Sequence, residues 1–441
     1  MRHCAPARGP LRGTVRVPGD KSVTHRALLF APLGDGPSRV DGWLEAEDTL
    51  RSLEAVRVLG ADIQRGRGDL VIAPGSFPQA GDASDEALMV DIDCGNSGTT
   101  TRLLLGLLAG RRVRARLDGD ASLRSRPMAR VVEPLRAMGA VIRYLGEDGR
   151  LPLEIHGRSL TGISHGMTVA SAQVKSALLL SGLTAVGSTT VLGGGRSRDH
   201  TERMLRAMGA KVTGDGDEID VCSGSTLRAF DLDVPGDPSS AAFPLASALL
   251  VPGSQITVAG MMLNATRTGI SEVFRRMGVA FTVESTGDAA GEPVGGLSLG
   301  FGPLRSFSLG GAEIPTLIDE IPMLAVLASR AAGITRIRDA ADLRTKESDR
   351  IAVTAAGLRA LGVEVAEHPD GMDIVGRPEG YPVGDSVVVH THGDHRIAMA
   401  FAVAGLASSH GVELDDDDCV GVSYPGFFDD IERLQGGGAP G

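Results

Sequence analysis

The stretch that decides the fold is Asp91–Gly110, DIDCGNSGTTTRLLLGLLAG. Its small polar residues lead into an uninterrupted apolar segment, Leu103–Ala109, which ends at a glycine. This order predicts a polar cap, a buried helix and a glycine C-terminus. The free N–H groups and dipole of such a helix start can bind an anion, and Arg102 adds a positive charge one turn later. Taken alone, the stretch also fits a well-capped core helix.

The same pattern occurs six times in the chain. The five other segments begin with polar residues, become rich in Ala and Leu and end at glycine: Lys21–Gly34, Ser171–Gly187, Gly236–Gly253, Asp319–Gly333 and Gly393–Gly405. Six amphipathic segments alternate with them and end in related sequences: VRVLGA (56–61), LRAMGA (135–140 and 205–210), FRRMGV (274–279), LRALGV (358–363) and, weakly, IERLQG (431–436). A spacing of roughly 70 to 85 residues predicts a small α/β unit used six times.

The length of 441 residues predicts two domains. Short alternating segments such as Leu70–Ala73 and Gln255–Val258 are typical of strands between the helices. The two similar sequences Pro18–Asp20 and Val234–Pro238 are the expected crossing points. We therefore expect one domain of residues 1–19 plus 236–441 and an inserted domain of residues 20–235, each with three repeats. The first strand then belongs with the C-terminal half.

Composition excludes several classes of protein. A net charge of -11 argues against a general nucleic-acid binder. No apolar run reaches about 18 residues and the N-terminus lacks an apolar leader segment, so we expect a cytoplasmic protein without membrane contact. The four cysteines have no paired spacing, which indicates neither a disulfide framework nor a zinc site. The histidines around Asp394 lack a second ligand cluster, so no metal is expected.

Lysine is rare in this chain, because only four of the 44 basic residues are lysines: Lys21, Lys175, Lys211 and Lys346. Three of them lie in the polar segments, where a compact donor is useful. If the helix starts point at one cleft, their dipoles and cations favour a small polyanion with phosphate and carboxylate groups. Lys346 beside Glu347 suits proton transfer, although Thr345–Arg350 also fits a capped, salt-bridged helix start. The absence of GxxxxGK[ST] and of a strand–GxGxxG–helix disfavours a P-loop kinase and a dinucleotide enzyme.

Eight motifs in order resemble the 5-enolpyruvylshikimate-3-phosphate synthase family. They are GDKSVTHRALL, GNSGTTTRLL, DASLRSRPM, ASAQVKSALLLSGL, SRDHTERML, LIDEIPMLAV, TKESDRI and GDHRIAMA, and the resemblance extends from about Gly13 to Phe428. It implies an α/β (α+β) fold of two globular domains. Each would contain three βαβαββ units, an inside-out α/β barrel, with the active site in the interdomain cleft.

The implied reaction transfers the enolpyruvyl group of phosphoenolpyruvate to the 5-hydroxyl of shikimate 3-phosphate and releases phosphate, without a metal or organic cofactor. On the matching motifs, the shikimate 3-phosphate ligands would be Lys21, Ser22, Arg26, Ser171, Ala172, Gln173, Ser197, Asp319 and Lys346. The phosphoenolpyruvate ligands would be Lys21, Gly98, Arg126, Gln173, Arg350 and Arg396. The catalytic residues would be Lys21, Asp319 and Glu347, with Glu347 as the acid–base group. The inhibitor glyphosate would occupy the phosphoenolpyruvate side, beside Gly98.

Two alternatives remain open at this point. The related UDP-N-acetylglucosamine enolpyruvyl transferases use Lys-Asn at the first motif and a loop Cys, whereas Ser22 follows Lys21 here and 120–127 contain no Cys. A non-catalytic polyanion-binding repeat protein would explain the arginines, but it would not require Asp319, Glu347 and the retained lysines. The expected partners are the two small-molecule substrates, and the expected state is a monomer.

Overall fold

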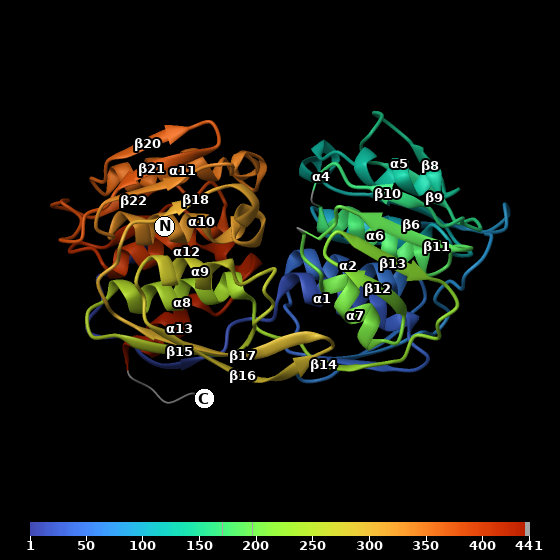
Figure 1. Ribbon diagram of the computed structural model, residues 1–441, viewed down its shortest axis with the longest axis horizontal. Coiled ribbons are helices and arrows are strands. Elements are labelled where there is room, and N and C mark those ends of the chain that lie inside the picture. Colours follow the sequence, from blue (N-terminus) through green and yellow to red (C-terminus); the bar gives the residue numbers. More distant parts are fainter. Residues whose placement is uncertain (170, 196, 437–441) are drawn as a thin grey trace. The chain divides into compact units, whose positions relative to one another are not determined.

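The computed structural model describes residues 1–169, 171–195 and 197–436. Contacts between Cα atoms divide the chain into two compact units. Unit 1 contains Met1–Pro18, Gly236–Gly287 and the chain from Pro293 onward, and unit 2 contains Gly19–Pro235 with the short segment Asp288–Glu292. Each unit contains three of the small sheets shown in Figure 1.

The module formed around the opening stretch shows the repeated topology. Its elements follow in the order β6 (Met89–Asp93), α3 (Gly98–Leu108), β7 (Arg114–Asp118), α4 (Ala121–Ser125), α5 (Ala129–Ala137), β8 (Val141–Tyr144) and β9 (Leu153–His156). The sheet order is β6-β7-β9-β8, with β6 parallel to β7 and both other pairs antiparallel. Since parallel neighbours need a crossover, α3 connects the first two strands, and the pattern is βαβαββ with an added short helix.

Unit 2 contains two further modules of this kind. The first has the elements α1 (Lys21–Phe30), β3 (Ser38–Asp41), α2 (Glu47–Val58), β4 (Asp62–Arg65) and β5 (Asp69–Ala73), completed by β14 (Asp231–Asp233). The second has β10 (Ser164–Gly166), α6 (Ala172–Gly182), β11 (Ser188–Leu192), α7 (His200–Ala207), β12 (Lys211–Asp215) and β13 (Glu218–Cys222). In both, the outer strand is parallel to its neighbour and the last two strands form an antiparallel pair.

Unit 1 repeats the module and uses the N-terminus to complete it. The first module runs through β2 (Arg12–Val15), α8 (Pro238–Leu250), β15 (Gln255–Met262), α9 (Gly269–Arg276), β16 (Phe281–Ala289) and β17 (Glu292–Gly300). The second runs through β18 (Ser308–Leu309), α10 (Ile321–Ser329), β19 (Ile334–Ile337), α11 (Arg350–Ala360), β20 (Val365–His368) and β21 (Gly371–Val375). The third has β22 (Val387–Val389), α12 (His395–Leu406), β23 (Val412–Leu414), α13 (Phe427–Gln435) and the N-terminal β1 (Arg2–Cys4).

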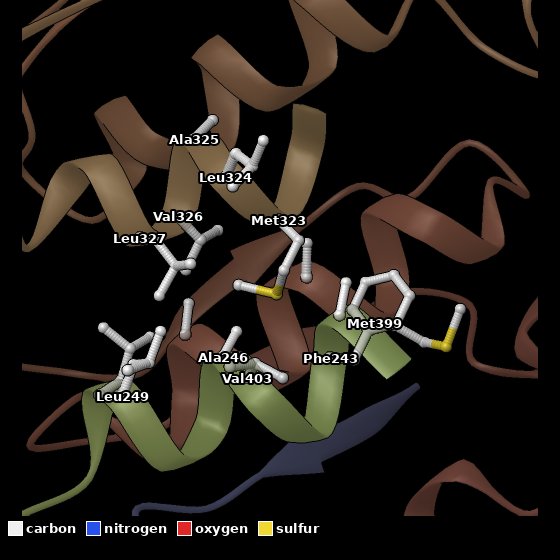
Figure 2. Packing of buried hydrophobic residues seen from close by; sticks show 14 of the residues in the cluster. Phe243, Ala246, Leu249, Met323, Leu324, Ala325, Val326, Leu327, Met399 and Val403 are labelled. Carbon is white, nitrogen blue, oxygen red and sulfur yellow. The ribbon is translucent and has the colours of Figure 1, made fainter. Parts of the chain in front are cut away.

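The core of unit 1 lies among the apolar helices α8, α10 and α12, whose residues are all buried. Figure 2 shows Leu249 and Phe243 of α8, Leu327 of α10, and Met399 and Val403 of α12 in this packing. Helices that are apolar on all sides must be covered on all sides. The neighbouring helices and the sheets of the three modules in unit 1 cover α8, α10 and α12.

The six predicted polar-headed helices are confirmed as α1, α3, α6, α8, α10 and α12. The first strand pairs with a strand of the C-terminal half, because β2 is parallel to β15 with Arg12 opposite Gln255. The long hairpin of β16 and β17 was not predicted. Its tip, Asp288–Glu292, groups with unit 2, where a carboxylate oxygen of Glu292 lies 2.8 Å from Nδ1 of His200.

Candidate active site

The first helix start that carries a predicted site residue is that of α1. Asp20 caps the helix by accepting a hydrogen bond from the Val23 N–H at 2.8 Å. Lys21, the first helical residue, forms an ion pair with Asp48 of α2, and the half-buried Ser22 follows it. An anionic ligand at this helix start would therefore compete with Asp48 for the Lys21 ammonium.

Arg26 is buried in α1, 2% exposed. Its Nε donates to Thr201 Oγ1 at 2.7 Å, while its two terminal nitrogens donate to Ser22 O and Ser176 Oγ, each at 2.9 Å. Burial lowers the pKa of Arg26 to about 10, so the guanidinium is still charged at neutral pH. All three of these acceptors are neutral oxygens. Since a guanidinium has five N–H donors, Arg26 can still bind a carboxylate.

A second group of polar side chains surrounds the start of α3. Arg102 donates to Gln173 Oε1 at 2.6 Å, and the Gln173 amide donates to Thr99 Oγ1 at 2.9 Å. A Cβ atom on Gly98 would lie 2.8 Å from Arg102 Nη1 and 3.4 Å from Arg126 Nη1. The structure therefore brings together the predicted residues Gly98, Arg126 and Gln173, with Arg102 among them.

The electrostatics of this group favour an anion. Burial, together with the like charges of Arg126 and Arg130, lowers the pKa of Arg102 to about 10. In the described part of the chain neither Arg102 nor Arg126 forms an ion pair with a carboxylate. Two neighbouring guanidinium groups without an acid repel each other, and a bound phosphate or carboxylate would relieve that repulsion.

The start of α6 carries neutral donors. Ser171 caps the helix by accepting a hydrogen bond from the Val174 N–H at 3.4 Å, and Ala172 is the first helical residue. Ser197, 6% exposed, donates its hydroxyl hydrogen to Gly194 O at 2.8 Å. The hydroxyls and the N-terminal N–H groups of α6 are suited to a phosphate.

Unit 1 contains the predicted acids, which gather around one arginine. Arg350, the first residue of α11, is 1% exposed at its side chain. It donates to Asp394 at 2.8 Å, to Glu347 at 2.7 Å and to Asp319 at 3.4 Å. The Lys346 ammonium lies 3.7 Å from Asp319. Segments around residues 319, 347 and 394 thus place three carboxylates and two cations in direct contact.

Two neighbours complete this cluster. Arg396, in the first turn of α12, donates to the backbone oxygen of Asp319 at 3.4 Å. Ser348 donates to Asp394 at 3.0 Å, and Asp394 also caps α12 through the Arg396 N–H. These contacts hold Asp394 fixed, and Asp394 in turn fixes the guanidinium of Arg350.

Arg350 keeps Glu347 ionised. Partial burial works against ionisation, but the charge of Arg350 outweighs it and lowers the pKa of the Glu347 carboxyl to about 2, with a smaller contribution from His395 at the acid pH where that ring is protonated. Burial and the positive charges of Arg396 and Arg350 lower the pKa of His395 to about 3, so this ring is neutral at pH 7. The Glu347 side chain is 42% exposed, so a ligand can reach it.

Sequence reasoning missed the carboxylates that hold the predicted cations in place. Asp48 pairs with Lys21, and Asp394 pairs with Arg350. Asp394 lies in the motif GDHRIAMA directly before a predicted helix, so its capping role was a detectable signal. Asp48 had no such signal, because its partner lies on another helix.

One group of side chains in the described residues has the geometry to hold a metal ion. The ligand atoms of Asp199, His200 and Glu292 lie within 4.8 Å of one another. Arg203 donates to Asp199 at 2.8 Å and lies 4.0 Å from Glu292. A guanidinium in that position competes with a cation for both carboxylates. The histidines near Asp394 are not part of this group.

Comparisons with known proteins identify the family. The family model of EPSP synthase (3-phosphoshikimate 1-carboxyvinyltransferase) matches residues 6–431. The chain belongs to the EPSP synthase family. A 3-phosphoshikimate 1-carboxyvinyltransferase of Parasynechococcus marenigrum is 48% identical over 97% of both chains, and one of Anaeromyxobacter is 47% identical over 98% of both.

The solved structures agree with this family. An EPSP synthase of Acinetobacter baumannii has a TM-score of 0.87 and 38% identity, covering 98% of this chain and 97% of that one. The enolpyruvyl transferase NikO of Streptomyces tendae, at 19% identity and a TM-score of 0.76, shares the fold. The mixed α/β fold implied by the motifs is confirmed, and membership of the EPSP synthase family makes the chain an enzyme. None of the described helices has the length and apolar character needed to cross a membrane.

Proposed function

We propose that this enzyme transfers the enolpyruvyl group of phosphoenolpyruvate to the 5-hydroxyl of shikimate 3-phosphate, and that Lys21, Asp319 and Glu347 are its catalytic residues. The family supports the reaction. The observation that carries the residue roles is the cluster around Arg350, where Asp319, Lys346 and Glu347 meet. Carboxylates beside cations can exchange protons with an anionic substrate.

Shikimate 3-phosphate is recognised through its two anionic groups. Ser22 and Arg26 hold the carboxylate, because the Arg26 guanidinium has donors left over. Ser171, Ser197, Gln173 and the backbone of Ala172 hold the phosphate, because α6 begins there. Asp319 and Lys346 act on the attacking hydroxyl.

Phosphoenolpyruvate is held by positively charged side chains and by the accessible backbone at Gly98. Its ligands are Lys21, Gly98, Arg126, Gln173, Arg350 and Arg396. Gly98 permits a close approach because it lacks a Cβ, and Arg126 lies next to it. An anion near Arg350 would weaken its attraction for Glu347, and the pKa of the Glu347 carboxyl would then rise toward a value at which it can donate a proton.

The proposed chemistry has two steps that share Glu347. First, Glu347 in its protonated form donates a proton to the methylene carbon of phosphoenolpyruvate, while the 5-hydroxyl oxygen bonds to the adjacent carbon and passes its own proton to Asp319. In the second step the new methyl group returns a proton to the Glu347 carboxylate and the double bond re-forms. The carbon–oxygen bond to phosphate breaks, and the departing phosphate takes the proton held by Asp319. A group that gives and later takes a proton at the same carbon must be able to exist in both states.

Phosphate release tests the reaction. We expect release from phosphoenolpyruvate to require shikimate 3-phosphate, with one phosphate released per 5-enolpyruvylshikimate 3-phosphate formed. UDP-N-acetylglucosamine in place of shikimate 3-phosphate should give no release. Release with the sugar nucleotide would favour the related transferase, and binding of both anions without release would favour a non-catalytic protein.

The enzyme is further proposed to be a cytoplasmic monomer. Its four cysteines are free, two of them buried, as is usual in a reducing compartment. Light scattering coupled to size-exclusion chromatography should give a mass near 45.7 kDa. A mass of twice that value would replace the monomer with a dimer.

A further inference from the structure

We propose that Lys175 is a positioning residue that lets Ser197 bind the phosphate of shikimate 3-phosphate, an inference that rests on the phosphate role proposed above for Ser197. Lys175 lies one turn into α6 and is 1% exposed. Its ammonium forms an ion pair with Glu202 of α7 at 2.6 Å, and the Glu202 side chain is 2% exposed. The charge of Lys175 is therefore matched inside unit 2.

The remaining hydrogens of the ammonium bond to the loop that carries Ser197. Lys175 Nζ donates to Gly194 O at 3.2 Å and to Ser197 O at 3.3 Å. A Cβ on Gly194 would lie 2.9 Å from Lys175 Cδ, so the loop also packs directly on the lysine side chain. One buried ammonium thus bonds to two backbone oxygens three residues apart.

Three N–H or O–H donors lie within hydrogen-bond distance of Gly194 O, one more than the oxygen has lone pairs. It accepts from the Ser197 N–H at 3.1 Å, from the Ser197 hydroxyl at 2.8 Å and from Lys175 at 3.2 Å. A carbonyl oxygen has two lone pairs. The Ser197 hydroxyl can therefore turn from Gly194 O to a phosphate oxygen while Lys175 and the Ser197 N–H keep the carbonyl satisfied.

Removal of Lys175 would take away the surplus donor at Gly194 O. Gly194 O would then keep the Ser197 N–H and the Ser197 hydroxyl as its donors, and turning the hydroxyl to a phosphate would leave the second lone pair of this buried carbonyl without a donor. The loop would also lose the ammonium that joins Gly194 to Ser197. Recognition of the phosphate should weaken, while recognition of the rest of the substrate should not.

The test compares ligands with and without the phosphate. Dissociation constants for shikimate 3-phosphate and for shikimate are measured by calorimetry in the full-length enzyme. The variant is Lys175→Met combined with Glu202→Met, because replacing a buried ion pair by apolar residues leaves no unpaired charge. We expect the preference for the phosphorylated ligand to fall by about tenfold, the loss of one hydrogen bond to a charged group.

Two further variants separate positioning from charge and from general damage. Lys211→Met removes a lysine at the exposed start of β12 in the same unit and should leave the preference unchanged. Lys175→Gln combined with Glu202→Gln keeps an N–H donor, leaves no unpaired buried charge and should retain the preference to within about threefold. This polar double variant also serves if the apolar double variant does not fold.

The dependence on Ser197 is tested with Ser197→Ala. If Lys175 acts through this hydroxyl, the effects of the two changes on the preference will not add. Additive effects, an unchanged preference, or equal weakening of both ligands would overturn the inference. If the wild-type enzyme releases no phosphate from phosphoenolpyruvate with shikimate 3-phosphate, the proposed function itself fails, and that result is distinct from an unchanged preference in an active enzyme.

Discussion

At the scale of single residues, Glu347 depends on the charge beside it. Arg350 donates to Glu347 at 2.7 Å, while its Nε and the same terminal nitrogen donate to the two carboxylate oxygens of Asp394 at 2.8 and 3.3 Å. The carboxylate form of Glu347 is the ground state of the free protein, because its pKa is about 2. The residue is therefore ready to accept a proton, and it becomes an acid only when a ligand weakens the influence of Arg350.

The variant Glu347→Gln should lower turnover by about 10² to 10⁴-fold with little change in substrate affinity. Glutamine keeps the volume and can still accept a hydrogen bond from Arg350, but it cannot exchange a proton. Steady-state phosphate release measures both quantities. Glu364→Gln, at an exposed position, is the matched control. Turnover within a few fold of wild type would mean that another carboxylate, first of all Asp319, transfers the proton.

The titration of Glu347 should change when phosphoenolpyruvate binds. In the free protein the carboxyl should stay ionised from neutral pH down to well below pH 4, since its pKa is lowered to about 2. The anionic ligand offsets the charge of Arg350, so the pKa should rise. Carbon-13 NMR of labelled glutamate side chains measures the pKa of Glu347 in the free protein and in the complex with phosphoenolpyruvate. The variant Glu347→Gln assigns the signal. A free-protein pKa near the ordinary glutamate value would contradict this account.

Gly98 controls the space at the start of α3. A methyl group there would lie 2.8 Å from Arg102 Nη1, so in Gly98→Ala the guanidinium must move. We expect the inhibition constant of glyphosate to rise about tenfold or more and the KM of phosphoenolpyruvate to rise less, since crowding costs about 1–3 kcal/mol and the inhibitor is longer. Gly302→Ala, with no atom within 4 Å of the new Cβ, is the control. Equal inhibition constants would show that Gly98 does not line the site.

At the scale of elements, α3 and α6 approach closely because of one glycine. A Cβ on Gly106 would lie 2.2 Å from Ala177 O and 2.4 Å from Ala177 Cα, and backbone atoms cannot yield as a side chain can. Gly106→Ala should destabilise unit 2 by about 1–3 kcal/mol or more. Thermal unfolding followed by circular dichroism tests this, with Gly421→Ala, whose Cβ would meet no atom within 4 Å, as the control. Equal melting temperatures for both variants would contradict the close approach.

The elements that sequence predicted are those with a strong local pattern. The polar-headed helices combine a cap, an apolar run and a terminal glycine, and these signals lie within about 20 residues. The hairpin strand β16, FTVESTGDA, is exposed along most of its length, so it lacks the alternation that marks a strand with one buried face. Likewise, the site cations were visible in the motifs, and Asp394 was visible there as a helix cap. Its pairing with Arg350, and that of Asp48 with Lys21, depend on contacts between different helices.

At the scale of the whole molecule, the two units have separate cores and should respond separately to ligands. The single tryptophan, Trp43, lies in unit 2, so its fluorescence reports the unfolding of that unit. The residues proposed to bind the anionic groups of shikimate 3-phosphate lie mainly in unit 2. At a ligand concentration of a hundred times the dissociation constant, shikimate 3-phosphate should raise the free energy of unfolding of unit 2 by about 2.7 kcal/mol. The transition of unit 2 should therefore respond first. Calorimetry and tryptophan fluorescence during heating test this. If shikimate 3-phosphate shifted only an unfolding transition that calorimetry detects and tryptophan fluorescence does not, the assignment of its binding residues to unit 2 would be contradicted.

The pairing of β2 with β15 also has a consequence for synthesis on the ribosome. Arg12 pairs opposite Gln255, so the N-terminal strand leaves the exit tunnel well before its partner has been translated. At about 5–20 residues per second, the delay of roughly 240 residues is on the order of tens of seconds. Unit 2, whose main segment Gly19–Pro235 is complete by then, can fold in that interval. The nascent N-terminus must meanwhile stay accessible and avoid mispairing, which makes it the segment where a chaperone would be most useful.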